Sequence, residues 1–182
     1  QQDDISLVEL LAAPVKNKVV TSSQPSLMIP WEVTYKLNAE QIKREVDPVS
    51  EIIKLLPNDF YFFHRIGMIR SILSELYSNA VEHGLLGLSS EMKLNPAGFA
   101  KYYASRHSKV NDLKSGHVEI SLNFNFHRKN NELLIHVEDS GDGFDFEKIK
   151  AEDLIINNSS YGRGLALVES FSESVKFSKG GA

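Results

Sequence analysis

The sequence contains no cysteine, which excludes disulfide frameworks and thiolate metal sites. It also lacks any apolar run near the roughly 20 residues that a membrane helix requires. Positively charged residues are fewer than negatively charged ones: the chain has 20 Lys and Arg and 24 Asp and Glu, which gives a formal net charge of −4. A chain with that balance has no field to hold nucleic acid by its phosphates. These absences predict a cytoplasmic protein that binds neither membrane nor nucleic acid.

The remaining composition is that of an ordinary globular protein. The chain has 182 residues, of which 42% are hydrophobic and 24% charged, enough for one well-filled core. We expect a linker with an attached helix over residues 1–26 and one domain over 27–182, with an insertion at about 85–117. The chain begins with Gln1 and ends in Gly-Gly-Ala, so we expect it to be a piece of a longer protein.

Strands are indicated by alternation of apolar and polar residues. Trp31, Val33, Tyr35 and Leu37 predict a half-buried strand over residues 28–38. The same period predicts a hairpin with strands over 118–126 and 133–138, and a further strand over 174–178. Strands and helices mix without regular alternation, which predicts an α/β two-layer sandwich.

Helices are indicated by apolar residues at intervals of three and four. Asp47 and Pro48 open a helix that Pro57 stops, and Pro96 opens an inserted helix that extends to about Leu113. A short helix is predicted over 165–171. The longest runs from about Phe60 to Gly84, and its apolar side consists of Ile66, Ile69, Leu73, Leu76 and Ala80.

A polar stripe on this long helix borders its apolar side. At about 100° per residue, Glu75, Asn79, Glu82 and His83 fall within roughly a third of the circumference. Polar groups at the margin of a core can line a ligand site. For an isolated Glu-x-x-x-Asn, however, a solvated face is the commoner explanation.

Two glycine-rich turns follow. Asp139, Gly141 and Gly143 come directly after the second hairpin strand, where glycines let a flat ligand approach the backbone and an acid can accept from an amino group. A plain tight turn, or a fragment of a calcium loop, would also explain them. The second turn, Gly162-Arg163-Gly164-Leu165, opens a helix, whose first N–H groups favour anions such as phosphate. A simple flexible helix start is an equally good explanation.

The three motifs in this order resemble the N, G1 and G2 boxes of the GHKL ATPase superfamily. The form Glu75-x-x-x-Asn79-Ala-x-x-His83-Gly84 is most similar to the anti-sigma-factor serine kinases of bacterial partner switching, over about residues 28–182. The insertion around residues 99–103 further resembles kinase domains at the C-terminus of response regulators that also carry a serine phosphatase domain.

The resemblance implies a Bergerat fold, a mixed and mainly antiparallel sheet covered on one face by helices, with a lid at residues 145–161. It implies ATP and Mg²⁺ as cofactors and gives each motif residue a role. Glu75 would be the general base, Asn79 the Mg²⁺ ligand and Asp139 the acceptor for the adenine amino group. Gly141 and Gly143 would close on the base, while Gly162, Arg163, Gly164 and Leu165 would hold the phosphates. His83 would either contact the nucleotide or bond the backbone.

The function implied by the resemblance is an ATP-dependent protein serine/threonine kinase. Its substrate would be a small anti-anti-sigma-like (STAS-like) protein. The alternative is a non-catalytic nucleotide-binding switch that sequesters a sigma factor or another regulator. A histidine kinase catalytic domain ranks third, because it would need an upstream helical hairpin with a phosphoacceptor histidine. The oligomeric state is left open, a homodimer included.

Overall fold

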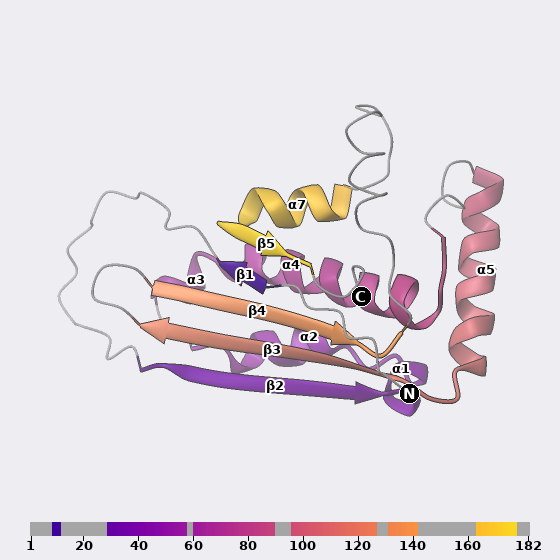
Figure 1. The fold of residues 1–182 in the computed structure, drawn as a ribbon, viewed down its shortest axis with the longest axis horizontal. Helices are drawn as coiled ribbons and strands as arrows, with labels where there is room; N and C mark the ends of the chain where they lie inside the picture. The colour runs from indigo at the N-terminus through magenta and orange to yellow at the C-terminus, as the bar shows by residue number, and fades with distance from the viewer. Residues whose placement is uncertain are drawn as a thin grey trace.

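A computed structural model describes residues 9–11, 29–57, 60–89, 96–126, 131–141 and 163–177 of the chain. Five strands form one sheet in the order β2-β3-β4-β1-β5, and each neighbouring pair is antiparallel. The strands are β1 (Glu9–Leu11), β2 (Trp31–Asn38), β3 (His117–Phe126), β4 (Asn131–Asp139) and β5 (Ser174–Lys176). The sheet and its helices make the two-layer α/β sandwich that the sequence predicts (Figure 1). The pairings within the described residues show no parallel component.

The helices are α1 (Ala39–Lys43), α2 (Pro48–Leu55), α3 (Phe60–Phe63), α4 (Ile66–Asn79), the π-helical turn η1 (Ala80–Leu85), α5 (Pro96–Asp112) and α7 (Arg163–Phe171). Helix α2 begins as predicted, because the Asp47 side chain accepts a hydrogen bond from the Ser50 N–H at 3.1 Å. Within the described ranges, no helix combines the length and the apolarity needed to cross a bilayer.

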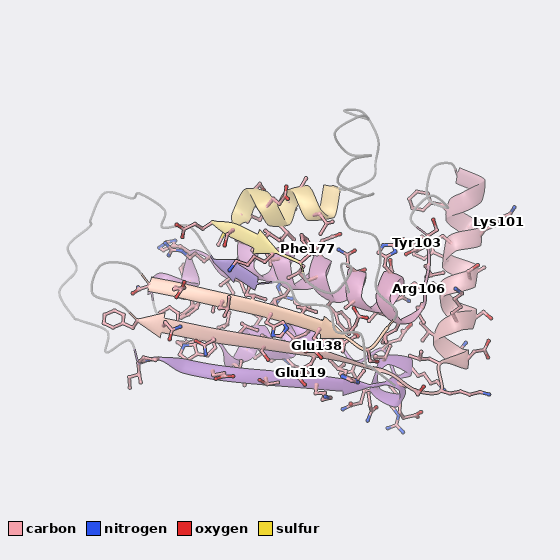
Figure 2. All side chains as sticks on the ribbon, viewed as in Figure 1. Lys101, Tyr103, Arg106, Glu119, Glu138 and Phe177 are labelled. Atoms are coloured by element: carbon pink, nitrogen blue, oxygen red, sulfur yellow. The ribbon has the colours of Figure 1, made fainter. Side chains whose placement is uncertain are left out.

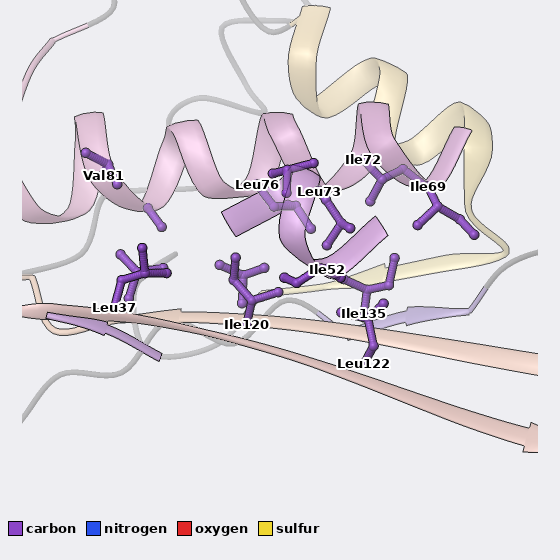
Figure 3. Packing of buried hydrophobic residues seen from close by; sticks show 14 of the residues in the cluster. Leu37, Ile52, Ile69, Ile72, Leu73, Leu76, Val81, Ile120, Leu122 and Ile135 are labelled. Atoms are coloured by element: carbon purple, nitrogen blue, oxygen red, sulfur yellow. The ribbon is translucent and has the colours of Figure 1, made fainter. Parts of the chain in front are cut away.

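The hydrophobic core lies between one face of the sheet and the helices (Figure 3). Strand β3 contributes alternate residues, among them Ile120 and Leu122, which are both fully buried. Helix α4 covers them with Ile69, Leu73 and Leu76. The period of two on the strands therefore meets the helical period on α4, as the two patterns predict.

The opposite face of the sheet is polar. Here Lys36 pairs with Glu119 across β2 and β3 at 3.1 Å, and Thr34 pairs with Ser121 at 3.0 Å. Cross-strand pairs of this kind stabilise a sheet by a few tenths of a kcal/mol up to about 1 kcal/mol each.

Two sequence predictions are corrected by the fold. A linker with an attached helix was expected over residues 1–26, but within it Glu9–Leu11 forms strand β1 between β4 and β5. The reason is tertiary, because pairing on both sides satisfies its backbone groups. The long helix is also interrupted: α3 ends at Phe63 and α4 begins at Ile66. The break falls at His64 and Arg65, where the Arg65 N–H donates to the Phe62 carbonyl, three residues earlier, at 2.9 Å and so makes a tighter turn than an α-helix. Ile66, expected on the buried side, is 40% exposed at the start of α4.

Candidate nucleotide site

The predicted general base and metal ligand lie one turn apart on α4. The side chains of Glu75 and Asn79 are both half-buried, and they lie beside the buried Leu76 and Ala80. The polar stripe therefore borders the core, as the helical wheel predicts, and neither side chain is fully exposed to solvent.

The last residues of the stripe, Glu82 and His83, lie on a π-helical turn. Residues Ala80–Leu85 form a π-helical turn, in which the N–H of Leu86 donates to the carbonyl of Val81, five residues earlier, at 3.0 Å. Such turns are rare overall, but those that occur are often found at functional sites. His83 Nδ1 donates to the carbonyl oxygen of Leu88 at 2.6 Å, since a carbonyl can only accept. Of the two roles expected for His83, the structure shows the backbone bond, and its contact with a nucleotide stays a prediction.

Asp139 ends strand β4 in a buried position against the π turn. Its side chain is only 3% exposed, and its Oδ1 accepts a hydrogen bond from the Gly141 N–H at 2.8 Å. A Cβ added to Gly84 would overlap the Asp139 carboxyl group, and one added to Gly141 would overlap the Gly84 carbonyl. The first and second motifs are therefore in direct contact, and glycine is needed on both sides of that contact.

The turn after Asp139 is held by Ser140, a residue outside the predicted site. The Ser140 N–H donates to the His117 carbonyl at 3.1 Å, and its hydroxyl accepts from the His117 N–H at 2.9 Å. This pair of bonds joins the turn to the start of β3. It fixes the direction in which the chain leaves Asp139.

The third motif meets the first at the start of α7. A Cβ added to Gly164 would overlap the carboxyl group of Glu75. Helix α7 packs along α4, and its Val168 is fully buried while Leu165 is half-buried. The Glu75 carboxylate thus lies at the N-terminal end of a helix, where the helix dipole favours negative charge.

Some of the predicted site lies outside the described residues. This applies to Gly143, Gly162 and the expected lid at 145–161, and also to the side chain of Arg163, whose backbone begins α7. The structure thus places Gly164 beside Glu75 near the middle of the α4–η1 segment, and Asp139 and Gly141 beside Gly84 near its C-terminal end. The phosphate contacts of the other positions stay predictions.

A polar cluster beside the π turn was not predicted as a unit. It consists of Glu82 on η1 and of Tyr102 and Arg106 on α5; we refer to it as the Glu82 cluster. Burial, and then the hydrogen bond to Glu82, raises the pKa of the Tyr102 hydroxyl above its ordinary value. The only signals in the sequence were the place of Glu82 in the polar stripe and the spacing of Tyr102 and Arg106 by one helical turn.

The donor atoms on α4 are compatible with Mg²⁺ held together with phosphates. Among the described residues, no three His, Cys, Asp or Glu side chains gather as a metal site. Mg²⁺, however, prefers oxygen ligands, keeps several waters and often takes only one or two protein ligands beside phosphate oxygens. The carboxamide of Asn79, one turn from the carboxylate of Glu75, meets that modest requirement.

An antiparallel α/β sandwich with these motifs in this order has the layout of an ATP-binding domain. The family model described as "histidine kinase-like ATPase domain" matches residues 61–182, so the chain belongs to this family. No curated protein and no solved structure matched the chain in the other two comparisons. ATP binding is the property expected of this family.

Proposed function

We propose that this domain is an ATP-dependent protein serine/threonine kinase of the anti-sigma-factor type, acting in the cytoplasm. Its substrate is proposed to be a small anti-anti-sigma-like protein. The observation that carries the proposal is the contact between Glu75 and Gly164, because it puts a carboxylate beside the helix start expected to hold the phosphates.

In this proposal Asp139 orients the base of the nucleotide. Its carboxylate accepts from the adenine amino group, and its bond from the Gly141 N–H keeps the carboxyl group from rotating. Gly84 and Gly141 have no Cβ, so the backbone at both positions can pack closely around this carboxylate. Burial of Asp139 strengthens such a hydrogen bond, since water competes less for a buried acceptor.

Glu75 is proposed to act as the general base in phosphoryl transfer. The serine oxygen of the partner forms a bond to the γ-phosphorus while the bond from that phosphorus to the β–γ bridging oxygen breaks. The serine proton passes to the Glu75 carboxylate, and the products are phosphoserine and ADP. Asn79 would hold Mg²⁺, which when bound neutralises charge on the phosphates. If water took the place of the serine, the same residues would hydrolyse ATP.

The test uses labelled ATP and a small anti-anti-sigma-like protein as the candidate substrate. We expect phosphoserine on that protein, and we expect Glu75→Gln to lower the rate by about 10² to 10⁴ while ATP still binds. Glu119→Gln, a change on the polar face of the sheet, serves as the control and should leave the rate unchanged. Intact ATP binding without phosphoserine would argue against the kinase and for the alternative, a nucleotide-binding switch that sequesters a sigma factor or another regulator.

The histidine kinase alternative receives no support from the described residues before α3. These residues form β1, β2, α1 and α2, whereas a phosphoacceptor histidine of that class requires a helical hairpin. Transfer to a histidine of the same chain would nevertheless be visible in the labelling experiment, because phosphohistidine is lost in acid and phosphoserine is not.

A further inference from the structure

Helix α5 lies at one end of the sandwich (Figure 1), and its Tyr102 and Val110 join the hydrophobic core. It lies between the first two motifs in the sequence and contributes no strand or layer to the fold. Lys101 points away from the rest of the molecule (Figure 2), and the Tyr103 side chain is 59% exposed. The opposite side of α5 is attached to the π turn η1 by specific polar contacts.

The first attachment is the Glu82 cluster. The Tyr102 hydroxyl donates to Oε2 of Glu82, and Arg106 Nε donates to Oε1 at 3.0 Å. Tyr102 is fully buried, and the side chain of Glu82 is 12% exposed. Both carboxylate oxygens are thus held by donors from successive turns of α5, and hydrogen bonds to a charged group are stronger than neutral ones. This fixes the rotation of Glu82, and with it the backbone of η1.

The second attachment is at the end of the same turn. Lys109 Nζ donates to the carbonyl oxygens of Leu86 at 2.6 Å and of Gly87 at 3.3 Å. Carbonyls at the end of a helix lack partners within the helix, and a cation there also complements the helix dipole. Helix α5 therefore contacts η1 both at its middle, through Glu82, and just after its end.

The π turn connects Asn79, at one end of the proposed site, with the contact to Asp139 at the other end. It begins directly after Asn79 and contains Gly84, whose Cα packs against the Asp139 carboxyl group. Converting the turn to ordinary α-helix would move the residues after Asn79 to a different angle about the helix axis. Gly84 would then no longer face Asp139, and a residue with a Cβ would take its place.

We propose that α5 is a positioning element, in which Tyr102 and Arg106 act through Glu82 to keep η1 in its π-helical form. Through η1 they set the contact between Gly84 and Asp139 and so the geometry of the nucleotide site. The consequence for nucleotide binding rests on the proposed function, but the consequence for the structure of η1 does not. Tyr102 and Arg106 are positioning residues that act at a distance from the proposed reacting atoms.

The experiment compares Tyr102→Phe with Tyr103→Phe, its exposed neighbour on the same helix. For each full-length variant we measure Mg-ATP affinity by calorimetry, hydrogen exchange of the amides of residues 80–86, and urea unfolding. Tyr102→Phe is expected to speed exchange in η1 by about tenfold or more and to weaken Mg-ATP binding by about fivefold to twentyfold, as removal of one hydrogen bond to a buried charge suggests. Tyr103→Phe should change neither.

Glu82→Gln and the double variant Tyr102→Phe/Glu82→Gln complete a cycle. If the residues act as one unit, the double variant should exchange no faster in η1 than the worse single variant. Arg106→Lys, which cannot reproduce the Nε geometry, should show a smaller effect of the same kind.

Wild-type exchange rates across 80–86 in Tyr102→Phe would overturn the proposal, as would a loss of stability with unchanged Mg-ATP affinity. If Tyr102→Phe does not fold, Arg106→Lys and Glu82→Gln decide by the same measurements. If the wild-type protein does not bind Mg-ATP at all, the proposed function fails, while the exchange measurements still decide whether α5 holds the π turn.

Discussion

Replacing Gly84 by alanine tests the closest contact between the first and second motifs. The new Cβ would overlap the Asp139 carboxyl group, which is buried and already bonded to the Gly141 N–H. A flexible surface side chain could move aside at little cost. Asp139 cannot, because moving its carboxyl group would break that bond in a place that water does not reach.

The expected cost follows from three contributions. Overpacking a well-packed interior costs about 1–3 kcal/mol, and leaving a buried hydrogen-bonding group unsatisfied costs about 1–3 kcal/mol. Alanine recovers about 1 kcal/mol over glycine in a helix. Gly84→Ala should therefore lower the free energy of unfolding by about 1–5 kcal/mol. Since Asp139 must move, nucleotide affinity should fall as well.

Gly67→Ala on α4 is the matched control, because a Cβ there has nothing within 4 Å. This variant should gain about 0.5–1 kcal/mol from helix propensity alone. The two variants change the same atoms on one helical segment, so urea unfolding should give shifts of opposite sign. Equal shifts, or a Gly84→Ala protein as stable as the wild type with unchanged ATP affinity, would refute the packing argument.

Three further predictions concern other parts of the structure. Gly164→Ala should displace the Glu75 carboxylate, a flexible side-chain end, and so lower phosphoryl transfer at least tenfold in the labelling assay while thermal stability holds. Asp47→Ala should lower the free energy of unfolding by about 1 kcal/mol at pH 7. Hydrogen bonds from Ser50 hold the pKa of Asp47 below its ordinary 3.8. The stability difference between the variant and the wild type, measured by urea unfolding, should therefore shrink as the pH falls below that value. Burial and Glu82 raise the pKa of Tyr102, so this tyrosine should keep its proton above pH 10. Tyr102→Phe should therefore leave the phenolate absorbance of the folded protein near pH 10 unchanged. Because the unfolded chain loses this proton first, Tyr102 should lower the free energy of unfolding only as the pH rises past 10.

The regular elements could be predicted from the sequence because their patterns are local. Strand β2 shows strict alternation from Trp31 to Leu37, and α2 has Asp47 and Pro48 at its start. The hairpin of β3 and β4 repeats the period of two over both strands. Each of these signals lies within the segment that it describes, so no knowledge of distant contacts is needed.

Helix α1 could also have been predicted, because its start carries a local signal in the sequence. Asn38 accepts from the Gln41 N–H at 3.0 Å, and the Gln41 side chain accepts from the Asn38 N–H at 2.9 Å. This reciprocal pair is a capping box, and its spacing is visible in the sequence. Strand β1 is different, because three residues are too few to show a period.

For the predicted site residues, position on the fold could be derived from the sequence but contacts only in part. The wheel placed Glu75 and Asn79 correctly at the edge of the core, since both lie on regular helix. It could not show that residues 80–85, which include Glu82 and His83, form a π turn, where a period of 3.6 no longer holds. The partners of Glu82 are 20 and 24 residues away, on a helix that only the fold brings alongside.

The contacts also help to decide whether the motif glycines are explained by packing within the protein or by a ligand. Gly84 and Gly141 are required by the packing of Asp139 and of the backbone around it, whether or not a nucleotide is bound, whereas a Cβ at Gly164 would displace only the flexible end of Glu75. The glycines alone are therefore weak evidence for a ligand. The bond from the Gly141 N–H explains a side-chain oxygen at the end of β4 but not a carboxylate, because the amide of an asparagine could accept the same bond without the cost of burying a charge. A ligand is therefore needed to explain the acidic residues more than to explain the glycines beside them.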